Sequence, residues 1–171
     1  ILRTTTKLSH SQSVVELCDR VEVEDKPYQR DLRKYVMMPA SAIGRHVVVE
    51  ARDEKLANDS SDFFVNKVEY NDSEIGFITA GIAYQYVKEV CPNASVLKLG
   101  LVNPLPKTLI EDFINKVEEV YVFEELEPVF EEQIKSWGIK CIGKEIFTVQ
   151  GEYSANMIRK AILKEEVAIN A

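Results

Sequence analysis

The sequence predicts a three-layer α/β domain over residues 74–171, in which helices cover both faces of a mainly parallel sheet, preceded by an irregular arm. Two observations support this fold class. From residue 74 onward, short apolar runs alternate with segments whose apolar residues recur at helical spacing. The connections between these segments are short and contain Gly or Pro, which is typical of a sheet built from βαβ units.

The first strand–helix–strand unit is expected within residues 74–100. Residues 74–80 form an apolar run that ends at Gly81, which is typical of a buried strand followed by a tight turn. Apolar residues then recur at helical spacing over 82–90, and Pro92 ends this helix. Residues 95–100 are again apolar and predict the second strand.

The next helix carries its apolar stripe over residues 109–117 and is preceded by Pro104 and Pro106. Proline is well tolerated at a helix start, because its missing N–H would have no partner there. A third strand is predicted at 120–123, and a third helix follows at 128–137.

The last elements are shorter. Gly138 is a suitable residue to end the third helix in the left-handed conformation. Residues 139–142 predict a fourth strand, and the spacing of apolar residues over 155–164 predicts a final helix.

The first 73 residues have a broken pattern without a clear period. A short helix is expected near 14–17 after three polar residues, and the apolar run 46–50 is a possible strand. Residues 53–72 are polar and acidic, and we interpret them as a linker or an amphipathic helix.

Composition excludes several classes of protein. The 21 Lys and Arg against 28 Asp and Glu give a formal net charge of −7, which argues against binding to nucleic acid or to an anionic membrane. No apolar run approaches the roughly 18 residues of a spanning helix. The chain begins at Ile1 without a Met or a signal peptide, so we expect a piece of a longer protein.

The three cysteines are far apart and form no CxxC pair. Neither a disulfide framework nor a zinc or iron–sulfur site is therefore expected. A reduced, cytoplasmic setting is the simplest interpretation. We expect Cys141 to be a small core residue, and Trp137 is expected to pack at a helix end.

The turn at Thr79 and Gly81 is one candidate binding site. It presents backbone N–H groups at the start of a helix, where an anion or a nucleotide such as coenzyme A could be held. The alternative is a plain strand-to-helix turn, because no GxGxxG motif or P-loop lysine follows.

Three carboxylates, Glu124, Glu125 and Glu127, follow the predicted third strand. Such a loop could bind a metal, act as acid or base, or pair with arginines of another domain or subunit. Metal binding would need further ligands that no nearby segment supplies. A solvated acidic turn and a domain or subunit contact remain the two main interpretations.

Arg3 and His10 belong to a polar cluster near the start of the chain that could face a ligand. Serines flank His10, but neighbours in sequence do not make a nucleophile–base pair. The alternative for His10 is a surface or capping residue.

Five segments, taken together and in this order, resemble the alpha subunits of indolepyruvate:ferredoxin oxidoreductases, a thiamine diphosphate-dependent family of 2-oxoacid oxidoreductases. The resemblance covers nearly the whole chain. The segments are 3–11 (RTTTKLSHS), 34–40 (KYVMMPA), 81–90 (GIAYQYVKEV), 97–106 (LKLGLVNPLP) and 122–128 (VFEELEP).

This resemblance implies a place within a larger enzyme. The chain would contain the tail of a pyrimidine-binding domain over 1–20, an arm over 21–73, and a transketolase C-terminal-like domain over 74–171. The parent enzyme would oxidatively decarboxylate aryl pyruvates to acyl-coenzyme A and pass electrons to ferredoxin. Its implied partners are the remaining domains of the alpha subunit, a beta subunit, ferredoxin and coenzyme A.

The resemblance also implies that the cofactors of the parent, thiamine diphosphate, Mg²⁺ and iron–sulfur clusters, are bound outside this chain. No Gly-Asp-Gly motif occurs here, and the cysteines are isolated. We therefore expect no cofactor and no catalysis in the chain alone. The alternative is a stand-alone ligand-binding or receiver-like α/β module, although the predicted third strand ends at Glu124 instead of the Asp that a receiver needs.

Overall fold

A computed structural model describes residues 6–166 of the chain. The chain divides into two compact units with the boundary between Met37 and Met38. Arg3 lies outside the described residues, so its predicted role near a ligand has no structural counterpart here.

The first unit contains two short helices, α1 (Thr6–His10) and α2 (Leu32–Tyr35). The Asp31 carboxylate accepts a hydrogen bond from the Lys34 N–H at 3.1 Å and so caps α2. The prediction of a helix at 14–17 is wrong, because these residues lie outside any helix or strand and are exposed. Without a surface to pack against, so short an apolar run does not nucleate a helix.

The second unit begins with α3 (Pro39–Asp59), a helix of 21 residues that leads into the short 3₁₀ helix η1 (Ser60–Asp62). The predicted strand at 46–50 is wrong, since these residues lie in α3. The run of valines favours a strand locally, but Pro39 at the helix start and the surrounding Ala, Arg, Glu and Lys residues favour a helix. Of the helices within 6–166, none is long and apolar enough to cross a membrane.

A four-stranded sheet forms the centre of the second unit, in the order β1-β3-β2-β4. The neighbours β3, β2 and β4 are parallel, and β1 pairs antiparallel with β3 at the edge. The strands are β1 (Lys67–Glu69), β2 (Asp72–Ala80), β3 (Ala94–Leu99) and β4 (Glu119–Phe123).

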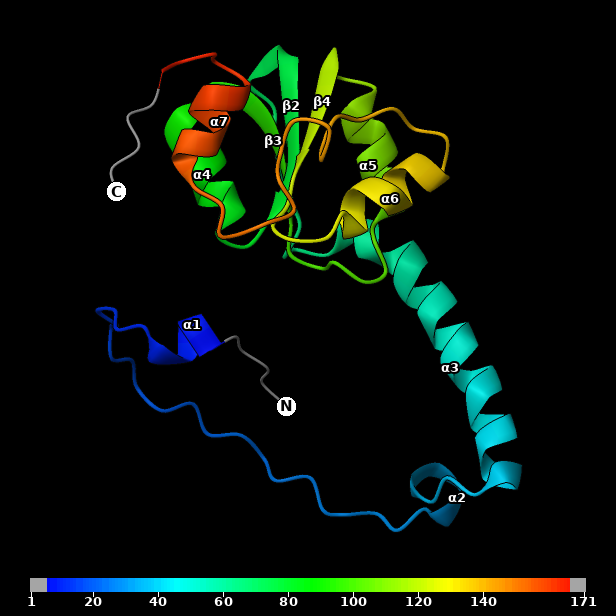
Figure 1. The fold of residues 1–171 in the computed structure, drawn as a ribbon. Helices are drawn as coiled ribbons and strands as arrows, with labels where there is room; N and C mark the ends of the chain where they lie inside the picture. The colour runs from blue at the N-terminus through cyan, green and yellow to red at the C-terminus, as the bar shows by residue number, and fades with distance from the viewer. Residues whose placement is uncertain (1–5, 167–171) are drawn as a thin grey trace. The chain divides into compact units, whose positions relative to one another are not determined.

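Helices cover both faces of this sheet, as the sequence predicts. Helices α4 and α7 lie together on one face, and α5 and α6 lie on the other (Figure 1). Their bounds are α4 (Ala83–Val90), α5 (Lys107–Ile114), α6 (Val129–Ser136) and α7 (Ala155–Ala161). The three-layer, mainly parallel α/β fold is therefore confirmed, and each helix predicted from residue 74 onward is present within a few residues of its expected bounds.

The strands supply both hydrophobic cores because neighbouring residues point to opposite faces. In β2, Phe77 faces the core under α4 and α7, whereas Ile78 faces the core under α5 and α6. In β3, Val96 and Leu97 divide in the same way. All four side chains are fully buried, as expected for strands covered on both faces.

The end of the sheet differs from the prediction. Residues 139–142 do not form a strand, and only Ile142 makes a single parallel bridge, to Tyr121 of β4. The chain turns away at Gly143, which passes so close to α6 that an added Cβ would lie 2.2 Å from a carboxylate oxygen of Glu131. Gly138 has φ of +81° directly after α6, which confirms its predicted role as the helix end.

Cys141 is buried in the core under α5 and α6, and Trp137 packs against that core, which confirms both predictions. Burial raises the pKa of the Cys141 thiol to about 11, so little thiolate forms at neutral pH.

Cys18, in contrast to Cys141, is exposed. We expect iodoacetamide to alkylate Cys18 at least about tenfold faster than Cys141 in the folded chain, as followed by peptide mass spectrometry. Equal rates would contradict the buried placement of Cys141.

Candidate functional site

A pocket of about 590 Å³ opens at the carboxyl ends of the parallel strands, and we call it the carboxyl-end pocket. The loops that follow β2, β3 and β4 and the start of α6 form its wall. Its lining residues are Ala80, Gly81, Ile82, Ala83, Val102, Asn103, Glu124, Glu125, Leu126, Glu127, Val129 and Phe130.

The strand order explains why a pocket forms at this place. The chain passes from β2 to β3 on one side, and then crosses to β4 on the other side of β2. The loops that follow β2 and β4 therefore diverge, because they lead to helices on opposite faces of the sheet. In open α/β sheets, such a switch in strand order is the usual position of a binding crevice.

Asn66 fixes the loop that follows β3. Its side-chain Oδ1 accepts hydrogen bonds from the N–H groups of Gly100 at 2.8 Å and Leu101 at 3.0 Å. Its Nδ2 donates to the carbonyl of Ser60 at 2.8 Å. The segment between α3 and β1, which the sequence suggests is linker, is thus an integral support of the pocket wall. A polar residue in a polar stretch gives no sequence signal for this contact.

Glu124 is buried, and its carboxylate caps the N-terminus of α6. Both carboxylate oxygens accept from the Phe130 N–H, at 3.1 and 2.9 Å, and one also accepts from the Glu131 N–H at 2.9 Å. A negative charge at this end of a helix is stabilised by otherwise unpaired N–H groups and by the helix dipole. Burial nevertheless raises the pKa of Glu124, and the two backbone N–H groups only partly oppose this.

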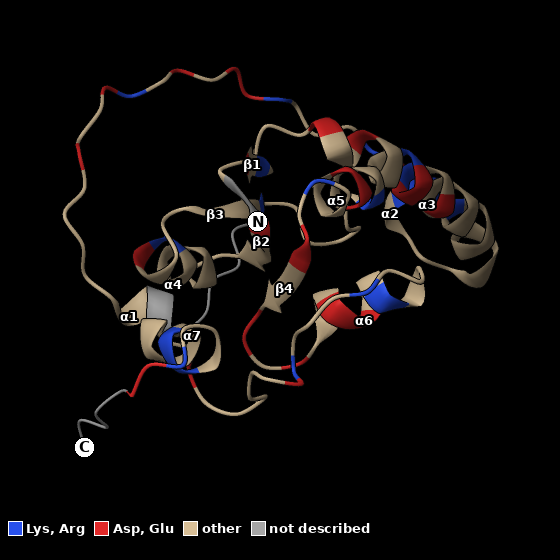
Figure 2. Cartoon of the chain, turned by 90° about the horizontal axis from the view of Figure 1, so that it is seen from above, with Lys and Arg blue, Asp and Glu red and all other residues tan. Residues whose placement is uncertain are grey.

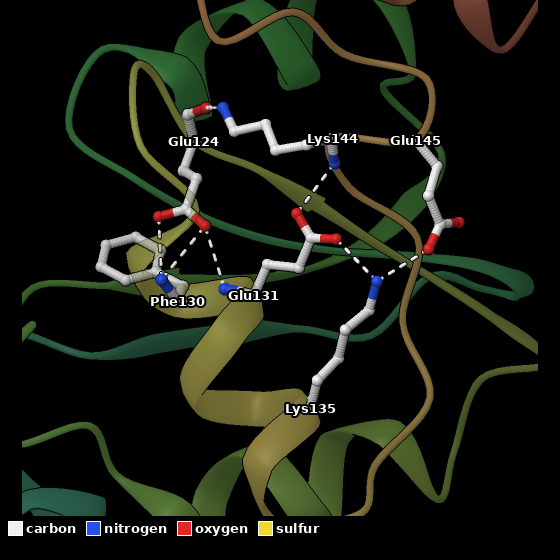
Figure 3. A network of polar contacts seen from close by, with 6 residues as sticks. All are labelled: Glu124, Phe130, Glu131, Lys135, Lys144 and Glu145. Carbon is white, nitrogen blue, oxygen red and sulfur yellow. Dashed lines mark hydrogen bonds and ion pairs between the residues drawn. The ribbon is translucent and has the colours of Figure 1, made fainter.

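A second carboxylate, Glu131, links α6 to the segment after Ile142 (Figure 3). It is buried and accepts from the Lys144 N–H at 2.8 Å. Its other oxygen binds the Lys135 ammonium at 2.7 Å, which also pairs with Glu145 at 2.7 Å. These two partners raise the pKa of Lys135. The network fixes the irregular segment that replaces the predicted fourth strand.

Lys144 connects this network to Glu124 and Tyr153. Its ammonium donates to the backbone carbonyl of Glu124 and, at 2.8 Å, to the hydroxyl of Tyr153. Burial lowers the pKa of Lys144, although the glutamates around it act in the opposite direction. Sequence reasoning missed Asn66, Lys144 and Tyr153, because Asn66 binds Gly100, 34 positions away, and Lys144 binds Tyr153, nine positions away.

The raised pKa of Glu124 makes a prediction about pH. A carboxyl group whose pKa is higher in the folded than in the unfolded state holds its proton more tightly when folded. Ionisation therefore costs stability as pH rises from the ordinary value of 4.5 through the raised value. We expect the free energy of unfolding of the wild type, minus that of Glu124→Gln, to fall across this pH window and then to level off.

Urea unfolding of both proteins at a series of pH values measures this difference. Glu124→Gln keeps an acceptor for the α6 N-terminus, whereas Glu124→Ala removes it and should cost about 1 to 2 kcal/mol. A wild-type minus Gln difference that rises with pH would contradict the assignment.

The structure places Thr79 and Gly81 at the end of β2. The Thr79 side chain is buried, and its hydroxyl donates to the Phe123 carbonyl of β4 at 2.8 Å, so it connects two strands. Gly81 has φ of +57° and lines the pocket. Of the described residues that line this pocket, none is Lys, Arg or His, so the charge of the site disfavours a phosphate-bearing ligand.

His10 is exposed at the end of α1, in the first unit. Ser9 lies beside His10 in α1, whereas Ser11 lies outside this helix. Neighbouring positions on a helix do not face each other, so adjacency in the sequence alone does not pair Ser9 with His10.

The three predicted contact residues divide into one buried and two exposed side chains. The side chain of Glu124 is buried within the domain, whereas Glu125 and Glu127 are exposed. Acidic residues, drawn red, follow β4 in Figure 2. Glu125 also accepts from the Tyr153 N–H at 2.9 Å. Over residues 6–166, no group of three His, Cys, Asp or Glu side chains lies close enough together to hold a metal ion.

Proteins similar to this chain are indolepyruvate oxidoreductase subunits of archaea. The chain is 34% identical over 182 aligned residues to subunit IorA of Thermococcus kodakarensis, covering 96% of this chain and 28% of that subunit. It is 32% identical to IorA of Archaeoglobus fulgidus, and this alignment also covers 96% of this chain and 28% of that subunit. The chain thus spans little more than a quarter of the length of these relatives. No protein-family profile matches it.

Among solved structures, 2-oxoglutarate:ferredoxin oxidoreductase from Magnetococcus marinus, solved with 2-oxoglutarate, coenzyme A and succinyl-CoA bound, has a similar fold. The two share a TM-score of 0.55 and 20% identity, over 75% of this chain and 24% of that one. This likeness supports the fold of the α/β unit.

Proposed function

Because this chain is homologous to a segment of the indolepyruvate oxidoreductase subunit IorA, we propose that it is a non-catalytic docking domain of a 2-oxoacid:ferredoxin oxidoreductase. The complete enzyme would oxidatively decarboxylate an aryl pyruvate such as indolepyruvate, with coenzyme A taking the acyl group and ferredoxin the electrons. Within it, residues 74–171 would form the transketolase C-terminal-like domain, 21–73 the arm and 1–20 the tail of the preceding domain.

The alignment with IorA of Thermococcus kodakarensis supports this proposal most directly. It includes 96% of this chain but only 28% of that subunit, so the chain corresponds to one segment of a longer protein. A segment of this size has its own two hydrophobic cores, so it is able to hold a fixed surface for its neighbours. In a protein like IorA, those neighbours would be the rest of the same subunit and a beta subunit.

The residues that the structure describes do not fit the cofactors that the proposed enzyme needs. Thiamine diphosphate with Mg²⁺ requires oxygen ligands for the metal and a positive environment for the diphosphate. The carboxyl-end pocket has exposed carboxylates instead, and none of its described lining residues is cationic. We therefore derive no chemical step within this chain and place the cofactors of the enzyme, including its iron–sulfur clusters, elsewhere in the proposed assembly.

A receiver-like regulatory module is the competing function. In such a module, an Asp at the end of a strand accepts a phosphoryl group. Here the residue directly after β4 is Glu124, whose carboxylate is buried and accepts hydrogen bonds from the N–H groups at the start of α6. This geometry leaves no free nucleophile at the strand end and favours the docking function.

The test is an assay of the longer protein, purified with its beta subunit. We expect the reduction of ferredoxin, followed by absorbance, to depend on indolepyruvate and coenzyme A. The chain of 171 residues alone should show no such reduction. Absence of 2-oxoacid-dependent reduction by the complete assembly would overturn the proposed enzyme, and turnover by the chain alone would overturn its non-catalytic role.

A further inference from the structure

The rim of the carboxyl-end pocket carries four exposed aliphatic side chains. Their exposed fractions are 51% for Ile82, 42% for Val102, 60% for Leu126 and 58% for Val129. They come from the loops after β2, β3 and β4 and from the first residue of α6. Single exposed aliphatic residues are ordinary, but several around one pocket are typical of a site that another molecule covers.

Leu126 also has an unusual backbone conformation. Its φ is +60°, in the left-handed region that glycine adopts freely and that leucine adopts at a cost. The loop therefore holds a strained residue whose apolar side chain is mostly exposed. Strain of this kind is retained where the surroundings or a function require it, and here the side chain gains little burial within the domain.

The charges around this apolar rim are negative. Glu125 and Glu127 are exposed on either side of Leu126. The ammonium of Lys144 is engaged by the Glu124 carbonyl and the Tyr153 hydroxyl, and Lys144 is not among the residues that line the pocket. A complementary partner would thus combine an apolar side chain with positive charge.

We propose that the carboxyl-end pocket seats an apolar side chain of a polypeptide segment that carries Lys or Arg beside it. The apolar side chain packs between Leu126, Val129 and Ile82, and the basic residues pair with Glu125 and Glu127. The occupant is a segment of the longer protein outside these 171 residues. This inference deepens the docking function proposed above and rests on it.

The length of the relatives supports this choice of occupant. The chain covers 28% of IorA, so a protein of that organisation has most of its residues outside this segment. A contact within one assembly also acts at high effective concentration, so a pocket of this size with a few aliphatic anchors is sufficient.

Site-specific cross-linking tests the proposal. The photoreactive residue p-benzoylphenylalanine replaces Leu126 in the longer protein, purified with its beta subunit. The control carries it at Leu163, which is similarly aliphatic and 43% exposed but does not line the pocket. After illumination, mass spectrometry should find the Leu126 adduct on a peptide with an apolar residue next to Lys or Arg, at least tenfold above the control.

An adduct on an acidic segment, an adduct on the beta subunit, or a yield no higher than the control would overturn the proposal. Oxidoreductase activity is measured on the same wild-type sample. An active assembly without the adduct contradicts this inference alone, whereas an inactive assembly contradicts the proposed function.

Two further variants separate docking from folding. Leu126→Gly relieves the left-handed strain, so it should raise the Tm of the 171-residue chain, while amides 124–130 of the longer protein should exchange hydrogen at least tenfold faster. Glu127→Lys, which leaves the hydrogen bond between Glu125 and the Tyr153 N–H in place, should accelerate the same amides. Glu132→Lys, at an exposed residue of α6 outside the pocket lining, should not. Unchanged exchange in the first two variants would overturn the proposal.

Discussion

Replacing Gly100 by Ala should destabilise the domain by about 2 to 3 kcal/mol, because the added methyl group meets backbone that cannot move aside. An ideal Cβ at this position would lie 2.3 Å from the carbonyl oxygen of Val65 and 2.7 Å from its carbonyl carbon. The same residue donates its N–H to Asn66 at 2.8 Å. The clash therefore falls on the contact that fixes the pocket wall, and urea unfolding measures the loss.

Gly44→Ala is the matched control for this substitution. Gly44 lies in the interior of α3, and nothing comes within 4 Å of a Cβ placed there. Alanine should stabilise this helix by about 0.5 to 1 kcal/mol, since glycine is a poor helix former. If Gly100→Ala and Gly44→Ala had the same effect, the close approach of Gly100 to Val65 would be disproved.

The second large effect is expected at Phe123, the last residue of β4. Its fully buried ring lies 4.9 Å from the Phe147 ring and 4.7 Å from the Tyr153 ring, measured between centroids. These contacts attach the irregular segment before α7 to the sheet. Phe123→Ala should cost about 3 to 5 kcal/mol, a large share of the roughly 5 to 15 kcal/mol that stabilises a typical domain.

Phe64→Ala provides the comparison, because the Phe64 side chain is 90% exposed. Its free energy of unfolding should change by less than about 0.5 kcal/mol. In the Phe123 variant, amides of residues 147–153 should also exchange faster, which hydrogen-exchange mass spectrometry detects. A small loss of stability with unchanged exchange would show that this aromatic cluster does not hold the segment.

The elements with strong periodicity are the ones that the sequence predicts well. Strands β2, β3 and β4 are continuous apolar runs, because both faces of each are covered. Helices α4 to α7 carry clear apolar stripes for the same reason. In these segments the secondary structure and the tertiary packing both favour apolar residues at the same positions. The spacing of apolar residues in the sequence is therefore sufficient to predict these strands and helices.

The elements that the sequence does not predict correctly lack such a pattern, or their structure depends on contacts with distant parts of the chain. Helix α3 has no buried residue, so no stripe distinguishes it, and its run of valines resembles a strand. Strand β1 is only three residues long and forms because β3 offers an unpaired edge. Residues 139–142 have strand-like composition, but α6 and the close passage of Gly143 allow only one bridge to β4.

The topology of βαβ units brings the turn at Gly81 and the acidic loop after β4 to one edge of the sheet, where both line the carboxyl-end pocket. The burial of Glu124 was not predictable, because it depends on where α6 begins relative to β4. The hydrogen bonds from Asn66 to the loop after β3 were also not predictable from the sequence, since the two N–H groups that it binds lie 34 and 35 residues away.

The most direct test of the central claim is a calorimetric titration of the folded 171-residue chain with thiamine diphosphate and Mg²⁺. We predict no saturable heat, because the pocket presents carboxylates to the diphosphate and the described residues provide no group of metal ligands. Saturable binding with a micromolar Kd would contradict the account, since a cofactor site within this chain would make it part of the catalytic machinery.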